Sequence, residues 1–194
     1  MKLARSGSQT GGPLVRFLFP RLIILLLAPW SIGAQAPQRE AEKDTVAIVQ
    51  ASYIYNIAKL VEWRDPALRE GNFVIGVIGG TNLYQELIKK YANKTIGKQP
   101  IEVRKLPRSP QVEACNVLFV GLGELGLMAD IYKNVANKNI LLVTEYPGAL
   151  EDGAVVNFVN VDNTLRYELS MPNARKHRLE VGSTLKQLAQ RVVE

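Results

Sequence analysis

The chain has 194 residues, of which 47% are apolar and 22% charged, values typical of one globular domain. A lone cysteine, Cys115, and a lone histidine, His177, exclude both a disulfide-stapled scaffold and a zinc site of several such ligands. The formal charge of +6 does not indicate nucleic-acid binding, because residues 1–36 hold basic residues and no acidic one. Beyond them the charge is nearly balanced and forms no block, so we expect no nucleic-acid partner.

Residues 1–34 have the three parts of a secretory signal peptide. A basic region ends at Arg21, the apolar run Leu22–Trp30 follows, and small residues begin at Ser31. The apolar run is far shorter than the ~20 residues that cross a bilayer. We therefore expect cleavage near Ala34 and export from the cytosol, with no stable membrane span in the mature chain. An uncleaved amino-terminal anchor is the alternative.

The first predicted element after the signal is a helix. Residues 35–44 are polar and predict a short tether before a domain at 45–194. From Val46 two neighbouring apolar stripes recur at spacings of three and four, which predicts a helix buried on more than one side and ending near Trp63.

Strands and helices are then expected to alternate. Gly79-Gly80 follows an apolar run, and Thr81 or Asn82 is expected to cap a helix whose inner side carries Leu83, Leu87, Ile88 and Tyr91. The segment 101–104 alternates in polarity and predicts a strand nearer a sheet edge. The expected strands are 73–78, 101–104, 117–120 and 140–144, with a further helix at about 124–136.

The last third of the chain has a different pattern. Segments 155–159 and 165–169 flank Asp162-Asn163 and predict an antiparallel hairpin. A short helix is expected at 172–177, and a final helix carries Val181, Leu185, Leu188 and Val192 on one stripe. These elements together predict a three-layer α/β domain with a mixed, mostly parallel sheet, a carboxyl-terminal hairpin and flanking helices.

One glycine motif matches a dinucleotide-binding pattern. Gly121, Gly123 and Gly126 form G-x-G-x-x-G after a predicted strand, and Glu145 follows at the end of the next strand. Glu124 would place a carboxylate beside a pyrophosphate, and a hairpin follows in place of further strand–helix–strand units. We therefore expect a tight turn and no cofactor.

The remaining chemistry-bearing residues give no catalytic or metal-binding set. Cys115 begins a buried strand, so we expect an inert thiol; a thiol that pairs between two subunits is the alternative. His177 lies in a basic segment and is expected to face solvent. No catalytic pair of carboxylates is identifiable, so we expect no enzymatic activity.

Three residues near the end of the first helix are candidates for partner binding: Tyr55, Lys59 and Glu62. They are polar or half-polar on an otherwise buried helix, and Lys59 and Glu62 are spaced to pair on one face. They form either a solvated rim or a docking surface, because aromatic side chains supply large contact area with few rotors.

Four segments carry a resemblance to a known family. Tyr53–Trp63, Cys115–Val120, Leu165–Leu169 and Ser183–Ala189 resemble, in order and spacing, the YfiR family, over about residues 46–190. The resemblance implies a bacterial periplasmic α/β protein that represses a membrane-bound diguanylate cyclase by binding its periplasmic part. In that family repression lowers cyclic-di-GMP output and biofilm formation, and an outer-membrane lipoprotein relieves it.

The resemblance implies a non-enzymatic periplasmic regulator with an inner-membrane diguanylate cyclase as partner. An outer-membrane lipoprotein and a second copy of the chain are further candidate partners. Family members are tuned by internal disulfides, which this chain cannot form with Cys115 alone. A small-ligand-binding module that uses the glycine turns at the strand ends is the alternative function, and an enzyme with dispersed carboxylates is a third hypothesis.

Export can be checked on the protein itself. Because the basic region and short apolar run look cleavable, amino-terminal sequencing of protein from a periplasmic extract should begin near Gln35. A sequence that begins at Met1 or Lys2 would contradict cleavage.

Overall fold

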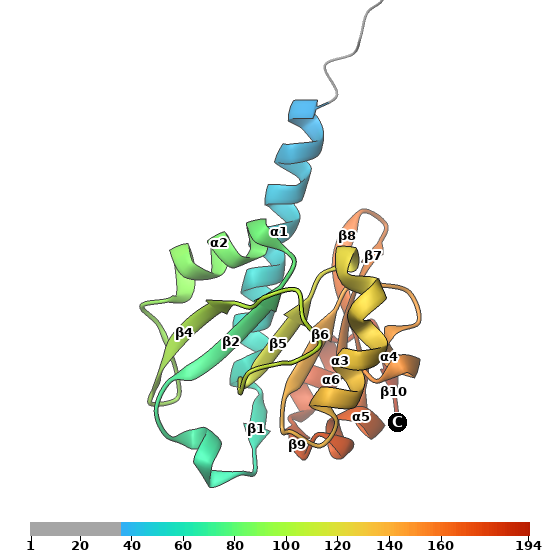
Figure 1. Cartoon of the computed structure of the whole chain (residues 1–194). Helices are drawn as coiled ribbons and strands as arrows, with labels where there is room; N and C mark the ends of the chain where they lie inside the picture. The colour runs from blue at the N-terminus through green and yellow to red at the C-terminus, as the bar shows by residue number, and fades with distance from the viewer. Residues whose placement is uncertain (1–35) are drawn as a thin grey trace, which may run out of the picture. The chain divides into compact units, whose positions relative to one another are not determined.

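A mixed sheet of eight strands organises the described chain, with the strand order β10-β8-β7-β6-β5-β2-β4-β3. The computed structural model describes residues 36–194, so the export signal predicted for residues 1–34 lies outside the described residues. Helices cover both faces of the sheet (Figure 1), and most neighbouring strands run parallel. The predicted three-layer α/β architecture with a carboxyl-terminal hairpin is confirmed.

The elements have the following bounds. The strands are β1 (Val61–Trp63), β2 (Phe73–Ile78), β3 (Thr95–Ile96), β4 (Gln99–Lys105), β5 (Val117–Val120), β6 (Leu141–Thr144), β7 (Val156–Val161), β8 (Thr164–Ser170), β9 (Leu179–Val181) and β10 (Arg191–Val193). The helices are α1 (Ala36–Lys59), η1 (Pro66–Arg69), α2 (Thr81–Tyr91), η2 (Leu122–Leu127), α3 (Met128–Val135), α4 (Ala149–Asp152), α5 (Met171–Lys176) and α6 (Ser183–Leu188), with η1 and η2 of the 3₁₀ type.

The centre of the sheet is buried on both faces. Every residue of β2, β5 and β6 is buried, as expected for parallel strands between two helical layers. Along β2, Phe73 and Ile75 face the core formed with α1 and α2, whereas Val74 and Ile78 face the core formed with α3 and α4. The strands predicted at 73–78, 101–104, 117–120 and 140–144 are confirmed, and β4 lies one strand from an edge.

The predicted hairpin is also confirmed. β7 and β8 pair antiparallel, and Asp162 and Asn163 between them have left-handed φ angles of 48° and 58°. Two successive left-handed residues match the twist of a two-residue hairpin, and aspartate and asparagine tolerate that backbone better than most residues.

Helix α1 differs from its prediction at both ends. It begins at Ala36, well before Val46, so residues 36–44 are helical where a tether was expected. This stretch has no apolar stripe, but it is rich in good helix formers, and Pro37 is tolerated in a first turn. Between Ala36 and Glu194 no helix is both long and apolar enough to cross a membrane.

The end of the predicted first helix is instead a strand. Helix α1 stops at Lys59, and Val61–Trp63 forms β1, which pairs antiparallel with β9. Val61 and Trp63 are buried while Glu62 between them is exposed, which is the period-two alternation of a strand. The prediction of helix up to Trp63 was wrong because Val61 also fits the helical spacing.

The prediction of a single carboxyl-terminal helix was also wrong. Val181 belongs to β9 and Val192 to β10, and only the short α6 lies between them. Leu188 is 64% exposed, so it is not part of a buried stripe. The residues have helical spacing in the sequence, but they are spread over three short elements and form no common stripe.

The middle helices also differ from their predictions in some details. Gly80, and neither Thr81 nor Asn82, is the cap residue of α2, and no side chain caps it. Its φ of 53° is left-handed, and a Cβ there would lie 2.9 Å from Phe119 Cε1, so this position favours glycine. Ile88 is 41% exposed, although Leu83 and Leu87 are buried as expected. The helix expected at 124–136 begins as the 3₁₀ helix η2 and continues as α3.

Trp63 connects β1 to the amino ends of two sheet strands. Its indole Nε1 donates to the backbone oxygen of Asn139, just before β6, at 2.9 Å. Its ring meets Phe73, the first residue of β2, edge to face with centroids 5.1 Å apart. Arg69 Nε donates to the Trp63 oxygen at 2.8 Å, so η1 is fixed to the same residue.

Replacing Trp63 should therefore destabilise the fold. In Trp63→Phe the buried oxygen of Asn139 loses its donor, and the smaller ring leaves unfilled volume. We expect the free energy of unfolding to fall by about 1–3 kcal/mol in urea titrations. Tyr91→Phe, which removes a half-buried hydroxyl on α2, is the control and should stay within about 0.5 kcal/mol. Equal losses in the two variants would contradict this role for Trp63.

Candidate functional site

Helices α1 and α2 together present an aromatic and cationic surface. The Tyr55 ring of α1 stacks on the Tyr91 ring of α2 with centroids 4.6 Å apart. The Lys59 Nζ lies 5.3 Å from the Tyr55 centroid, within the range of a cation–π contact. Both tyrosines are half-buried and Lys59 is exposed, so one side of this stack faces solvent.

Exposed isoleucines extend this surface along both helices. Ile48 is 39% exposed and precedes Tyr55 by seven residues, while Ile88 is 41% exposed and precedes Tyr91 by three. Residues at these spacings lie on one helix face. We call Ile48, Tyr55, Lys59, Ile88 and Tyr91 the α1–α2 surface.

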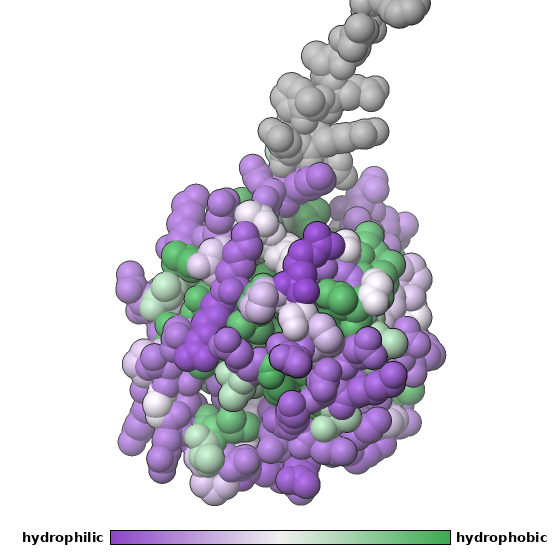
Figure 2. Space-filling model, viewed as in Figure 1, coloured by the Kyte–Doolittle hydropathy of each residue, from purple (hydrophilic) through white to green (hydrophobic). Residues whose placement is uncertain are grey.

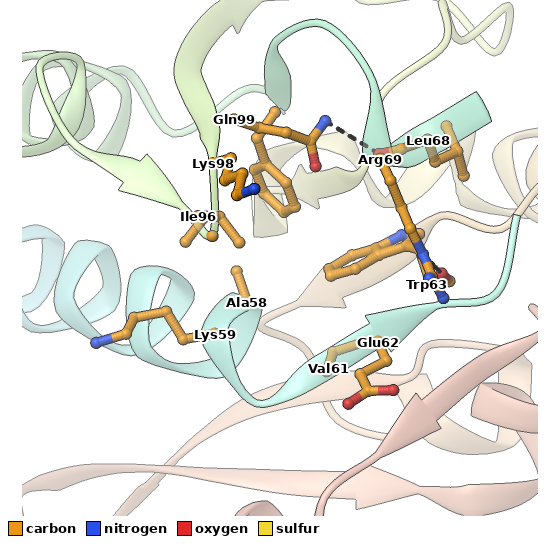
Figure 3. A pocket seen from close by; sticks show the side chains of 12 residues that line it. Ala58, Lys59, Val61, Glu62, Trp63, Leu68, Arg69, Ile96, Lys98 and Gln99 are labelled. Carbon is orange, nitrogen blue, oxygen red and sulfur yellow. Dashed lines mark hydrogen bonds between the residues drawn. The ribbon is translucent and has the colours of Figure 1, made fainter. Parts of the chain in front are cut away.

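A groove begins where this surface ends. Its cavity volume is about 560 Å³, and it lies between the end of α1, β1, η1 and the turn between β3 and β4. Figure 3 shows Lys59 at the end of α1 and Glu62 on β1, with Lys98 across the groove from them. We call it the β1 groove; its lining is Ala58, Lys59, Val61, Glu62, Trp63, Leu68, Arg69, Phe73, Ile96, Gly97, Lys98 and Gln99.

The β1 groove combines an apolar base with a mostly cationic rim. Trp63 and Phe73 are buried, and Ile96 packs against the same core. The rim carries Lys59 and Lys98 against the single carboxylate of Glu62. A segment with apolar side chains and net negative charge would match this lining.

Hydrogen bonds to the backbone hold the groove wall in place. Gln99 Nε2 donates to the oxygen of Leu68 at 3.1 Å (Figure 3), which joins β4 to η1, and to the oxygen of Glu70 after η1 at 3.2 Å. The Asp65 side chain accepts from the amide of Ala67 at 3.0 Å and caps η1. The groove is therefore formed by ordered backbone.

The structure places the three sequence-predicted residues next to one another. Tyr55 and Lys59 are in contact, and Lys59 and Glu62 line the same groove. The expected Lys59–Glu62 ion pair is not among those within 4.0 Å in the described chain, because Glu62 lies on a strand and no longer on the helix face. Sequence reasoning missed Lys98 and Gln99, which reach the groove only through the pairing of β4 with β2.

Apolar side chains do not form one broad patch on the face that Figure 2 shows. They lie there in separate small areas among hydrophilic residues. That face has no large continuous apolar area of the kind that obligate interfaces bury.

The G-x-G-x-x-G motif is a turn whose anion position is already filled. Glu145 Oε1 accepts from the amide of Leu122 at the start of η2 at 3.0 Å, and Gln50 Nε2 donates to Glu145 Oε2 at 2.7 Å. Cβ atoms at Gly123 and Gly126 would meet no atom within 4 Å, so close approach does not require glycine at either position. A carboxylate of the protein therefore occupies the place where this motif would hold a phosphate.

A second hollow lies beside these glycine turns. It has a cavity volume of about 740 Å³ at the carboxyl ends of β2, β5 and β6, where Gly80, Gly123 and Glu145 contribute to its wall. This is the edge at which open α/β sheets commonly bind ligands, since the chain order reverses between β2 and β5.

Cys115 is buried in the core on the side of α3. Burial raises the pKa of its thiol to about 12, so the unreactive thiol form prevails. Cys115 is 4% exposed, and a disulfide between subunits would require local opening there. Such pairing stays a prediction.

The expectation that His177 faces solvent was wrong. His177 is 3% exposed, and its Nδ1 is buried without a hydrogen-bond partner in the described chain. Burial, followed by the charge of Lys176, lowers its pKa to about 4. The basic neighbours suggested a surface turn, but α5 and β9 direct this side chain inward while Arg175 and Arg178 stay exposed.

Metal binding has no candidate cluster in the part of the chain that the structure covers. Between residues 36 and 194 no group of three or more histidine, cysteine, aspartate or glutamate side chains could hold an ion.

Comparison with known proteins gives one result. The protein-family model described as YfiR/HmsC-like matches residues 47–190, well over half of the chain. The chain therefore belongs to the YfiR/HmsC-like family, in agreement with the resemblance seen in its sequence. No curated protein matches the chain.

Burial of His177 should make stability depend on pH. Its folded pKa lies below the ordinary value of 6.5, so the unfolded chain binds the proton first as pH falls. The stability is present above about pH 6.5 and is lost as pH falls toward about 4. Between about pH 7 and 4.5 the wild type should lose about 2 kcal/mol more than His177→Leu in urea unfolding. Parallel losses in both proteins would contradict the neutral buried imidazole.

Proposed function

We propose that this YfiR/HmsC-like protein is a periplasmic, non-enzymatic regulator that binds the periplasmic part of an inner-membrane diguanylate cyclase and lowers cyclic-di-GMP signalling. Family membership supports a regulatory role, and the basic and apolar segments of residues 1–34 support export. Biofilm formation would fall with the cyclic-di-GMP output.

The observation that carries the proposal is the continuity of the α1–α2 surface with the β1 groove. Lys59 belongs to both, so one partner segment can contact the tyrosine stack and the groove together. Exposed aliphatic and half-buried aromatic side chains next to charged rim residues are typical of sites where a few residues supply most of the binding energy.

The contacts and burial of three ionisable side chains support a binding function rather than catalysis. Glu145 caps η2, and the buried Glu124 pairs with Arg108 at 2.8 Å. His177 is a neutral imidazole inside the core. The two carboxylates thus have structural contacts, and the imidazole is closed off from solvent.

Control of the regulator would come from competing partners. Internal disulfides cannot tune a chain with Cys115 alone, so release of the cyclase would depend on another protein. An outer-membrane lipoprotein is the candidate that family membership suggests, and a second copy of the chain is another.

A small-ligand-binding module is the alternative function. The hollow of about 740 Å³ at the strand carboxyl ends favours it, with Gly80 and Gly123 in its wall. Glu145 already occupies the anion position at η2, so the ligand would have to use the remaining wall. A small molecule retained by the native protein in mass spectrometry would favour this alternative.

Exposed residues of the site allow binding to be separated from folding. Lys59→Ala and Glu62→Ala remove exposed side chains and should change the free energy of unfolding by no more than about 0.5 kcal/mol. If they anchor the cyclase, each should weaken its binding by more than about 1 kcal/mol and raise cyclic-di-GMP in cells. Thermal melting and cyclic-di-GMP levels are measured on the same variants.

Lys133→Ala is the matched control. Lys133 is equally an exposed lysine of a helix, but α3 covers the opposite face of the sheet. It should melt and repress as the wild type does. Normal melting and normal repression in both Lys59→Ala and Glu62→Ala would contradict the proposed surface and direct attention to the β7–β8 hairpin.

A further inference from the structure

A third hollow lies just after the end of β1 and is lined by arginines. Its cavity volume is about 670 Å³, within the range of small-molecule sites. Arg64, Arg175 and Arg178 contribute to its wall, together with Asp65 and Asn139. We call it the arginine pocket.

Two of these arginines have no carboxylate partner in the described chain. Arg64 pairs with Glu180 across β1 and β9, whereas no ion pair within 4.0 Å involves Arg175 or Arg178 among residues 36–194. The one carboxylate in the wall, Asp65, is occupied by the amide of Ala67 and the Nδ2 of Asn139. The pocket therefore offers guanidinium donors to an anion from solvent.

Asn139, a residue of the pocket wall, also carries a buried acceptor. Asn139 is 7% exposed, and its Oδ1 is buried without a hydrogen-bond partner in the described chain. Its Nδ2 points to Asp65 Oδ2 at 3.4 Å, and the reverse orientation would set two oxygens against each other. A buried acceptor left unpaired is unfavourable, so a ligand that supplies a donor would be stabilised there.

We propose that the arginine pocket binds a small carboxylate that carries a hydroxyl or amino donor next to its acidic group. The carboxylate would lie against Arg175 and Arg178, and the donor would bond to Asn139 Oδ1 after a local movement of the wall that exposes this buried oxygen. This inference rests on the pocket alone and is independent of the proposed partner surface.

The backbone at this pocket allows clean substitutions. Asn139 and Arg178 have left-handed φ angles of 57° and 54°, which glycine adopts without strain. Asn139→Gly removes Oδ1 but keeps the backbone oxygen that accepts from Trp63. Arg178→Gly removes a guanidinium, and Lys176→Gln removes a neighbouring charge that does not line the pocket.

The probes are L-malate, succinate and sulfate, titrated into protein purified from cells expressing the full chain. Succinate lacks the hydroxyl of malate, and sulfate has no donor. Malate should bind saturably below about 10 mM and at least about fivefold more tightly than succinate or sulfate. Arg178→Gly and Arg175→Gln should weaken malate binding at least about fivefold, and Lys176→Gln should leave malate binding unchanged. In Asn139→Gly the preference for malate over succinate should disappear.

Each contrary result overturns the proposal. No saturable malate binding up to about 10 mM would show that the pocket is not a site for this chemistry. Equal affinities for malate and sulfate would show that the hydroxyl donor of malate makes no contact in the pocket. If Lys176→Gln weakened malate binding as much as Arg178→Gly, the effect would come from the net charge of the protein and not from contacts in the pocket. The melting temperature of each variant is recorded in the same samples. Arg175→Gln and Arg178→Gly each remove one guanidinium of the pocket, so they test its contribution to malate binding independently.

Discussion

The hydrogen bond from Trp63 Nε1 to the oxygen of Asn139 is the contact on which the arrangement of both β1 hollows depends. It fixes β1 against the amino ends of β2 and β6, where the indole also packs on Phe73. Trp63 lines the β1 groove, while Asn139 and the adjacent Arg64 line the arginine pocket. The positions of the groove and the pocket are thus set by one buried donor and one buried acceptor.

The two edges of the parallel strands are used differently. At the carboxyl edge, Glu145 satisfies the start of η2 and is itself held by Gln50 of α1. At the amino edge, β1 and β9 form a separate two-stranded ribbon; β1 lines the groove, while Arg64 after β1 and Leu179 of β9 line the arginine pocket. The carboxyl edge is thus partly filled by the protein's own carboxylate, and the amino edge keeps charged side chains available. This contrast is why we place recognition at the amino edge.

The sequence predicts the sheet well because its central strands are short, apolar and bounded by turn residues. β2 and the Asp162-Asn163 turn have local signals strong enough to define them. The family resemblance covers nearly the same residues as the matched family model. Tyr55, Lys59 and Glu62 were predicted as candidates from polar positions on an apolar pattern, and in the structure they lie near one another.

What the sequence could not predict depends on contacts between distant segments. β1 and β9 are three residues each and form because they pair with each other, so helical spacing misled both predictions. His177 is buried through the packing of α5 and β9, which its basic neighbours conceal. Lys98 and Asn139 reach their hollows through turns whose positions follow from sheet topology. Periodicity carries no information about such pairings.

We propose that a partner binds across the α1–α2 surface and the β1 groove. Amide hydrogen exchange of the protein, followed with and without the periplasmic part of the cyclase, tests it most directly. Exchange should slow on binding in residues 55–70 and 88–99, which contain the end of α1, β1, η1 and the β3–β4 turn. Slower exchange confined to the β7–β8 hairpin, with residues 55–70 unchanged in the complex, would contradict it.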